Sequence, residues 1–233
     1  MTTTTLITGG NKGLGRQAAQ QLVAAGHIVY VGARDPDRGR EAAAAVGSRY
    51  VPLDVTCDES VAAAAKQIES EVGHLDVLVN NAGISGGGFR PVSETTADDV
   101  QLVFGTNVFG VVRVTQAFLP LLRRSATPVI VNVSSGMGSF AITTDPSRLE
   151  STLVGLAYPS SKAALNMVTT MYAKAYPDIR VNAVDPGYTA TDLNGHRGTQ
   201  TTEEGVRVIV SMAQIASDGL TGTFADAAGV VGW

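Results

Sequence analysis

Hydrophobic and polar positions along this chain alternate between two kinds of segment. Short runs rich in β-branched residues have the length of buried strands, and longer segments show the apolar period of amphipathic helices. The runs predicted as strands are 3–8, 27–32, 50–53, 75–79, 128–133 and 179–184. The segments predicted as helices are 14–25, an Ala-rich segment from about residue 38, 59–72, 98–122 and 159–176.

The alternation of strands with helices predicts an α/β fold. Such βαβ units are right-handed and build a doubly wound parallel β-sheet with helices on both faces. No linker or internal repeat divides the sequence, so residues 1–233 are predicted to form a single domain that both binds a ligand and carries the chemistry. Ligands of such sheets bind beyond the carboxyl ends of the strands, so functional residues are expected directly after strands.

Composition narrows the class of protein. Hydrophobic residues make up 44% and charged residues 16%, which supplies a sizeable core and argues against disorder. A net charge of −4 argues against a nucleic-acid partner. The one cysteine, Cys57, allows no intrachain disulfide and gives no sign of an oxidising compartment. The start has no basic region and no apolar run approaches bilayer length, so a soluble cytoplasmic protein without a membrane partner is expected.

A glycine-rich loop follows the first predicted strand and opens directly into a helix. It reads Thr8-Gly9-Gly10-Asn11-Lys12-Gly13-Leu14-Gly15, with the spacing Gly-xxx-Gly-x-Gly rather than Gly-x-Gly-x-x-Gly. Glycines let the backbone approach a pyrophosphate, which the N-terminus of a helix attracts. A plain turn would also use glycines, but the position between strand and helix predicts a dinucleotide site.

The end of the second predicted strand bears on the choice of cofactor. NAD enzymes place an acid there on the ribose 2′-hydroxyl, whereas this strand ends in Ala33, followed by Arg34 and Asp35. Arg34 and Lys12 together provide two cations for a 2′-phosphate. A shift of two residues would instead make Asp35 a ribose acceptor, and Arg34 with Asp35 could also form a surface pair. NADP(H) is therefore the expected cofactor, with NAD(H) as the alternative.

Tyr158 and Lys162 lie four residues apart at the start of a predicted helix and so share one face. A free phenol has a pKa of about 10, too high for a base near neutrality, and a nearby ammonium lowers that pKa. With a serine hydroxyl beside the phenol, this arrangement predicts proton transfer to a carbonyl oxygen as hydride reaches the carbon. The pair alone is common on surface helices, so its significance depends on the motifs around it.

Seven such signatures occur in the order found in the short-chain dehydrogenase/reductase family, which the chain resembles over essentially its full length. Each is weak alone, and together they are specific. The resemblance implies a single-domain Rossmann fold and hydride transfer between a nicotinamide dinucleotide and a carbonyl or secondary alcohol. The matching segments are Thr8 to Gly15, Leu53-Asp54-Val55, Asn80-Asn81-Ala82-Gly83, Asn107, Ser135, Tyr158 to Lys162, and Pro186-Gly187-Tyr188-Thr189-Ala190-Thr191-Asp192.

The resemblance also implies roles for individual residues. Ser135, Tyr158 and Lys162 resemble the catalytic triad, and Ser134 is the neighbour with which the family's serine does not align. Asn107 resembles the fourth member, which holds a water linking Lys162 to solvent. The residues implied in cofactor binding are Gly9, Asn11, Lys12, Gly13, Leu14, Gly15, Arg34, Asp54, Val55, Asn81, Ala82, Gly83, Asn107, Tyr158, Lys162, Pro186, Thr189 and Thr191.

Within the family, the glycine loop, the sequence after the second strand and the tail 221–224 are most similar to the carbonyl-reductase branch, which uses NADPH. One departure concerns the 22 residues that separate Ser135 from Tyr158, more than most members carry. Monomeric carbonyl reductases have a much longer insert that covers the helices through which other members dimerise. Because this insert is intermediate, a homo-oligomer and a monomer both stay open.

A hydrolase is one alternative class. Residues 83–87 match Gly-x-Ser-x-Gly, and Asp185 and His196 follow in the order of that fold. The nucleophile must lead from a strand into a helix, however, and here Gly88 and Pro91 follow. A hydrolase is therefore disfavoured.

A dinucleotide-binding sensor or scaffold without turnover is the second alternative. Relatives of that kind usually lose the tyrosine or the lysine, whereas this chain keeps the full set. His27, His74 and His196 show no metal-ligand spacing, so no metal is expected. An enzyme is therefore favoured over a sensor.

The substrate pocket is expected from residues 85–90, 136–156 and 188–205, which are rich in Gly, Ala, Phe and Leu. Such a lining predicts a small apolar carbonyl or alcohol substrate. The working hypothesis is reduction of ketones, aldehydes or quinones.

Overall fold

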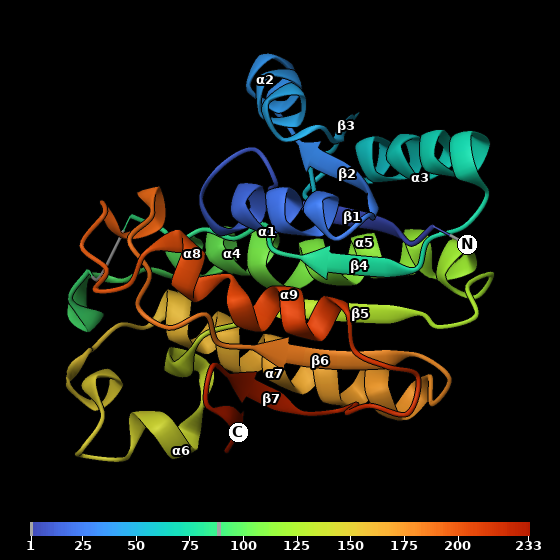
Figure 1. The fold of residues 1–233 in the computed structure, drawn as a ribbon. Coiled ribbons are helices and arrows are strands. Elements are labelled where there is room, and N and C mark those ends of the chain that lie inside the picture. The colour runs from blue at the N-terminus through green and yellow to red at the C-terminus, as the bar shows by residue number, and fades with distance from the viewer. Residues whose placement is uncertain (1, 88–89) are drawn as a thin grey trace.

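One eight-stranded sheet forms the centre of the molecule in the computed structural model, which describes residues 2–87 and 90–233 (Figure 1). The strands are β1 (Thr4–Thr8), β2 (Ile28–Ala33), β3 (Arg49–Pro52), β4 (Val77–Asn80), β5 (Val129–Val133), β6 (Arg180–Val184), β7 (Phe224–Asp226) and β8 (Gly229–Val231). Their order is β3-β2-β1-β4-β5-β6-β7-β8, and every neighbouring pair is parallel except β7 with β8. The predicted doubly wound parallel α/β fold is confirmed, and the antiparallel β8 is a departure from it.

Two helical layers cover the sheet. In Figure 1 α1 and α9 lie in front of the strands, with α5 and α7 behind them, and α3 packs against α5. The helices are α1 (Gly13–Ala24), α2 (Pro36–Val46), α3 (Asp58–Val72), α4 (Ala97–Phe104), α5 (Gly110–Leu122), α6 (Phe140–Thr143), α7 (Ala157–Ala175), α8 (Thr202–Gly205) and α9 (Arg207–Ala213). Shorter 3₁₀ turns are η1 (Val92–Glu94), η3 (Gly136–Gly138), η4 (Leu149–Thr152) and η5 (Asp192–Asn194).

Each central strand is buried on both faces. Leu6 packs into the core under α3, α5 and α7, and its neighbour Ile7 packs into the core under α1, α2 and α9. Successive side chains of a strand point to opposite faces, so both must be apolar when helices cover both faces. This is why the strands appear in the sequence as continuous apolar runs.

The helix predicted over 98–122 is interrupted. A π-helical turn, η2 (Gly105–Phe109), separates α4 from α5 and carries Asn107. The whole run, Ala97–Leu122, is long and apolar enough to span a bilayer, so the expectation that no run reaches that length is wrong. Val114, Phe118 and Leu122 of this run are fully buried against the sheet, so packing in the core accounts for their apolar character.

The strand order reverses between β1 and β4, which is the position where doubly wound sheets bind their ligands. The loops that follow β1, β4, β5 and β6 meet at the left of Figure 1. A buried hydrogen bond of 2.9 Å from Asn80 Nδ2 to Asn132 Oδ1 joins the carboxyl ends of β4 and β5. The sheet therefore brings the segments predicted to be functional to one edge.

Gly15 sits where α1 meets the loop after β4, and a Cβ there would overlap Asn81 Nδ2 and Gly9 O. Asn81 Nδ2 donates to Thr8 O (2.9 Å) and Gly9 O (3.1 Å), which holds the two loops together. Gly15→Ala is therefore expected to cost about 1–3 kcal/mol of the free energy of unfolding, measured by urea denaturation. Dinucleotide binding should weaken with it.

Gly105→Ala is the matched control, because Gly105 has helical φ and ψ of −51° and −45° and no atom within 4 Å of its Cβ position. It should be neutral or more stable by up to about 1 kcal/mol. Equal unfolding free energies for the two variants would contradict the packing described for Gly15.

Candidate active site

A cleft of about 570 Å³ lies beyond the carboxyl ends of the strands. The loops after β1, β2, β3, β4 and β6 line it together with the end of β5 and the first two turns of α7. The predicted cofactor residues on its wall are Gly9, Asn11, Lys12, Gly13, Leu14, Gly15, Arg34, Asp54, Val55, Asn81, Ala82, Gly83, Tyr158, Lys162, Pro186 and Thr191. The structure thus brings most of that predicted set around one space.

Three predicted site residues lie beside the cleft rather than on its wall: Ser135, Asn107 and Thr189. Thr189 is buried, and its Oγ1 donates to Pro186 O (3.0 Å), so it shapes the turn after β6. The wall also includes residues that the sequence did not single out for the cofactor: Leu53, Thr56, Ile84, Ser85, Gly86, Gly87, Leu102, Thr106, Val133, Ser134, Asp192 and Leu193.

The glycine loop makes close backbone approaches. Gly9 and Gly13 have φ of +62° and +52°, the left-handed region that favours glycine. A Cβ on Gly9 would lie 3.0 Å from Ala82 Cα, so a side chain would push the loop away from the β4 end. Lys12, at the N-cap of α1, gives that helix no side-chain hydrogen bond. The backbone N–H groups of the first turn of α1 therefore suit an anion.

Arg34 lines the cleft after β2 and is exposed. The alternative that pairs it with Asp35 is not what the structure shows. Asp35 caps α2 by accepting from Asp37 N and Arg38 N (3.1 Å each), and its nearby cation is Arg38. Arg34 therefore stands free of Asp35 at the end of the cleft.

Lys162 is 4% exposed, and its Nζ donates to Val133 O at 2.7 Å. Burial lowers the pKa of Lys162 to about 8, against the opposing charge of Asp185. The Nζ lies 5.6 Å from the centroid of the Tyr158 ring. One turn of α7 therefore holds the cation beside the phenol, as the i, i+4 spacing predicted.

Burial raises the pKa of Tyr158 to about 12, the Ser135 hydroxyl lowers it through a hydrogen bond, and the charge of Asp185 raises it. The expectation that the ammonium would bring the phenol toward neutrality is therefore wrong for the protein without ligand. Desolvation outweighs the hydrogen bond with Ser135, and the phenol carries its proton at neutral pH.

Ser135 follows β5 in extended conformation, and its Oγ accepts from Met137 N at 3.2 Å. The structure brings Ser135, which follows β5, together with Tyr158 and Lys162 of α7. Their contacts place a hydroxyl, a phenol and a buried ammonium at one end of the cleft.

Asn107 is 1% exposed, and its side chain joins three segments. Its Oδ1 accepts from Ile84 N (2.9 Å), and its Nδ2 donates to Ile84 O (3.0 Å) and Ser161 Oγ (3.0 Å). The side chain therefore ties η2 to the loop after β4 and to α7. A water linking Lys162 to solvent stays a prediction.

Residues 134–138 form a turn, here called the serine turn, that two buried hydrogen bonds to Asn166 hold against α7. These two bonds, here called the Asn166 clamp, were not predicted from the sequence. Ser134 Oγ donates to Asn166 Oδ1 at 2.6 Å, and Asn166 Nδ2 donates to Gly138 O at 3.1 Å. A Cβ on Gly138 would lie 2.6 Å from the carbonyl carbon of Lys162, so the turn rests directly on the helix. The sequence signal that could have predicted this contact is Asn166 itself, a polar residue four positions after Lys162 on the same face of the helix.

Asp185 directly follows β6 and is buried, with its Oδ1 accepting from Gly187 N at 2.9 Å. Its Oδ2 and Glu150 Oε1 each lie 2.9 Å from the position that a Cβ on Gly136 would occupy. Burial raises the pKa of Asp185, and the charge of Glu150 adds to the rise. The insert thus places a second carboxyl group beside the serine turn.

The hydrolase alternative has no geometric support. Ser85 Oγ donates to Leu193 O (3.3 Å), while His196 Nε2 pairs with Asp192 Oδ1 (2.9 Å). Asp185 is engaged by Gly187, so none of the three candidate residues contacts another in these pairs.

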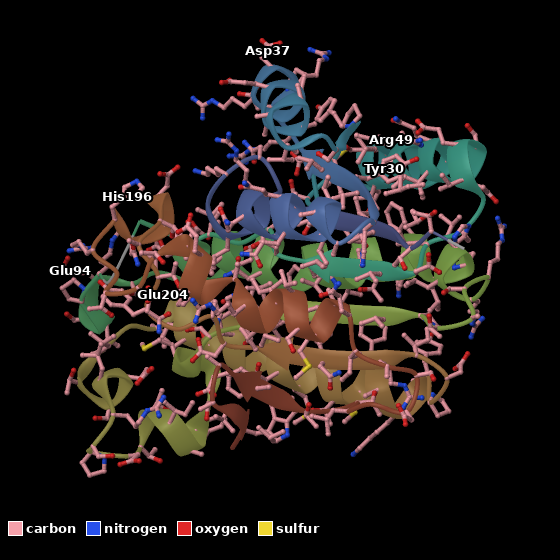
Figure 2. All side chains as sticks on the ribbon, viewed as in Figure 1. Tyr30, Asp37, Arg49, Glu94, His196 and Glu204 are labelled. Atoms are coloured by element: carbon pink, nitrogen blue, oxygen red, sulfur yellow. The ribbon has the colours of Figure 1, made fainter. Side chains whose placement is uncertain are left out.

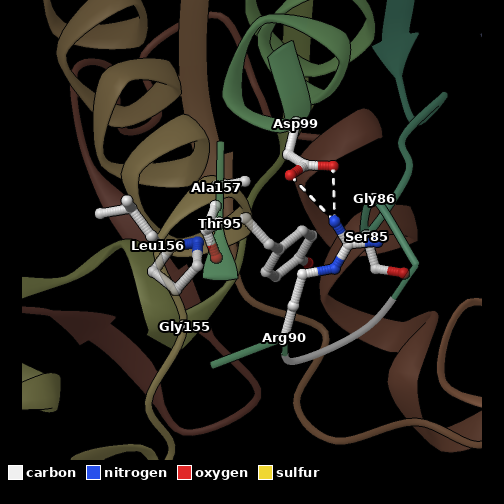
Figure 3. A pocket seen from close by; sticks show the side chains of 10 residues that line it. Ser85, Gly86, Arg90, Thr95, Asp99, Gly155, Leu156 and Ala157 are labelled. Carbon is white, nitrogen blue, oxygen red and sulfur yellow. Dashed lines mark hydrogen bonds and ion pairs between the residues drawn. The ribbon is translucent and has the colours of Figure 1, made fainter. Parts of the chain in front are cut away.

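A smaller cavity, shown in Figure 3, has Tyr158 as part of its lining. Arg90 spans it to Asp99, with its Nη1 3.2 and 3.0 Å from the two carboxylate oxygens. Its lining includes parts of two segments predicted for the substrate pocket, 85–90 and 136–156. Gly88 and Phe89 of the first segment lie outside the described residues. Its lining is Ser85, Gly86, Arg90, Thr95, Asp99, Gly155, Leu156, Ala157, Tyr158 and Pro159.

Comparison with known proteins agrees with this geometry. A family model described as short chain dehydrogenase matches residues 3–202. The chain belongs to the short-chain dehydrogenase family. The short-chain dehydrogenase anuI of Penicillium roqueforti is 39% identical over 221 residues, covering 89% of this chain and 87% of that protein. A (+)-neomenthol dehydrogenase of Capsicum annuum is 30% identical, covering 94% of each.

Among solved structures, NADPH-bound carbonyl reductase from chicken fatty liver superposes with a TM-score of 0.88 at 30% identity. The alignment covers 100% of this chain and 99% of that one. This short-chain dehydrogenase is therefore an oxidoreductase that uses a nicotinamide dinucleotide.

The clamp on the serine turn generates one prediction. Asn166→Leu removes both hydrogen bonds, so it should cost about 1–3 kcal/mol of stability. If the clamp positions Ser135, kcat should also fall by roughly 10- to 100-fold. Steady-state kinetics and urea denaturation measure both.

Thr169→Val is the matched control one turn along α7. It removes the buried hydroxyl that accepts from Asn132 Nδ2 at 2.9 Å, away from the serine turn. It should lose similar stability and keep kcat near that of the unmodified protein. A similar fall in kcat for both variants would show a general structural effect instead.

Asp185 generates a second prediction, on pH. Its charge raises the pKa of both Tyr158 and Lys162, so Asp185→Asn should lower both. If the Tyr158 phenolate is the base in alcohol oxidation, the rise of kcat/KM with pH should move to lower pH. Asp145→Asn, which changes an exposed carboxylate of the insert, should leave the profile in place. An unmoved or alkaline-shifted profile for Asp185→Asn is the contrary result.

Proposed function

We propose that this short-chain dehydrogenase is an NADP(H)-dependent carbonyl reductase that acts on ketones, aldehydes or quinones, with Tyr158 as the acid. One observation carries the proposal: the cations Lys12 and Arg34 line the same single cleft as Tyr158 and Lys162. Residues 1–233 would act as one domain that binds the dinucleotide and carries the reaction.

The cleft suits a dinucleotide for two reasons. The N-terminus of α1 presents backbone N–H groups beside the glycine loop, where a pyrophosphate would lie. Lys162 on the same cleft is buried, and Val133 O is its one protein acceptor among the described residues, which leaves donors for a ribose hydroxyl. Asp54 and Val55 would contact the adenine, and Pro186 and Thr191 would lie along the nicotinamide side.

The bound dinucleotide would supply hydride to the carbonyl carbon. Ser135 would hold the carbonyl oxygen by a hydrogen bond, and Tyr158 would donate its proton to that oxygen. A phenol pKa near 12 suits this direction, because the group is protonated at neutral pH. The Lys162 ammonium would then stabilise the phenolate that remains, and Asn107 would hold the water that returns the proton.

Two features favour NADP(H): the cations Lys12 and Arg34 line the cleft, and no carboxylate occupies the ribose-binding position at the end of β2. Ala33 occupies the position expected for a ribose-binding carboxylate, Asp35 is engaged as a helix cap, and Arg34 lines the cleft. Arg34 and Lys12 would bind the 2′-phosphate. The similarity to NADPH-bound carbonyl reductase supports this choice.

The substrate would be a small apolar carbonyl compound or the corresponding alcohol. Ile84, Leu102 and Leu193 line the cleft near Ser85, and a relative at 30% identity is a neomenthol dehydrogenase. The protein would act in the cytoplasm, as a monomer or homo-oligomer.

Tyr158→Phe removes only the phenolic oxygen. It should lower kcat for ketone reduction by about 10²- to 10⁴-fold and leave the Kd for NADPH nearly unchanged. Lys162→Ala should damage both turnover and dinucleotide binding. The assay is a panel of ketones, aldehydes and quinones, each with NADPH and NADH.

Near-normal rates for Tyr158→Phe would refute the proposed acid, and a clear preference for NADH would refute the cofactor assignment. Dinucleotide binding without turnover of any compound by the unmodified protein would instead favour the sensor or scaffold.

A further inference from the structure

Lys12, the glycine-loop cation assigned above to the 2′-phosphate, already has an anionic partner. Its Nζ lies 2.8 Å from Asp192 Oδ2, although the two residues are 180 positions apart. Asp192 begins η5 in the loop after β6, and both side chains line the same cleft. The ion pair therefore joins the glycine loop to the substrate-side loop across the dinucleotide cleft.

The carboxylate of Asp192 is held from both sides. His196 Nε2 lies 2.9 Å from Asp192 Oδ1, and His196 N donates to Thr191 O at 2.9 Å. His196 has φ of +59°, the one non-glycine with positive φ among residues 2–87 and 90–233, and Figure 2 shows it at the edge of the molecule. The hydrogen bond and charge of Lys12 lower the pKa of Asp192, so the carboxylate is ionised at neutral pH.

The pair is nevertheless easy to exchange. The side chains of Lys12 and Asp192 are 58% and 52% exposed, and ion pairs this open to water contribute little to stability. A 2′-phosphate carries more charge than one carboxylate and binds ammonium groups strongly. NADH has no such phosphate and would leave the pair intact.

Arg34, the other cation at the adenine end, makes no ion pair in the described part of the chain. The two cations therefore differ: Arg34 is available to a ligand from the start, and Lys12 must first leave a carboxylate.

We propose that Asp192 is a specificity-determining residue that competes with the 2′-phosphate of NADP(H) for Lys12 and so weakens the preference for NADPH over NADH. The exchange also frees the 191–196 segment from the glycine loop each time a phosphorylated dinucleotide binds. The inference rests on the proposed function, in which Lys12 binds that phosphate.

The test is the Kd of NADPH and of NADH, measured by fluorescence titration at fixed ionic strength, for the unmodified protein and Asp192→Asn. The variant keeps the size of the side chain and removes its charge. The Kd for NADPH should fall about two- to fivefold, and that for NADH should stay unchanged. An NADPH Kd that is unchanged or higher, or an equal change for both dinucleotides, overturns the inference.

Two controls separate competition from general charge. Glu203→Gln removes an exposed carboxylate of the neighbouring α8 that has no ion pair with Lys12, and it should leave both Kd values unchanged. In Lys12→Ala protein, adding Asp192→Asn should have no effect on the NADPH Kd. Asp192→Ser serves as a second variant if Asp192→Asn folds poorly.

Lys12→Ala alone tests whether Lys12 binds the 2′-phosphate, independently of whether Asp192 competes for it. If it leaves the ratio of NADPH to NADH affinity unchanged, the proposed role of Lys12 fails. If it lowers that ratio while Asp192→Asn does not raise it, the role of Lys12 stands and the competition fails.

Discussion

The site depends on keeping one ammonium group out of water. Lys162 is almost completely buried, and a buried cation needs an acceptor and a nearby negative charge. The carbonyl of Val133 and the charge of Asp185 meet that need from the ends of β5 and β6. The same desolvation holds the pKa of the lysine near 8 and that of the adjacent phenol near 12, so burial sets the protonation state of both groups.

That constraint accounts for several features of the packing. The serine turn can approach α7 closely only because Gly138 has no side chain, and the Ser134–Asn166 hydrogen bond then holds it there. Asn107 joins the opposite wall to the same helix through Ser161. Buried polar side chains that have hydrogen-bond partners of their own thus surround the Lys162 ammonium, and they limit how far it can move.

Much of the fold and the candidate site was predictable because both depend on local patterns. Continuous apolar runs marked the central strands, and functional motifs followed strands because parallel strands end at one edge. Other features depend on tertiary contacts that no local pattern encodes. The phenol pKa is set by burial, the Asn166 clamp by a turn 28 residues earlier, and the partner of Lys12 by a loop 180 residues away. The short strands β7 and β8 were missed because three-residue strands have almost no periodicity.

The π-helical turn Gly105–Phe109 has a consequence for the phase of the helices on either side. A π turn holds one residue more than an α-helical turn, and each residue of an α-helix advances the side chains by about 100°. Deleting one residue here would give a continuous helix, but it would rotate α4 relative to α5 by that angle. Val103 would leave the core, or Val114 and Phe118 would leave the sheet. The extra residue therefore lets α4 and α5 each turn their apolar face toward the core, although only the π turn separates the two helices. It also places the buried Asn107 at the turn between them.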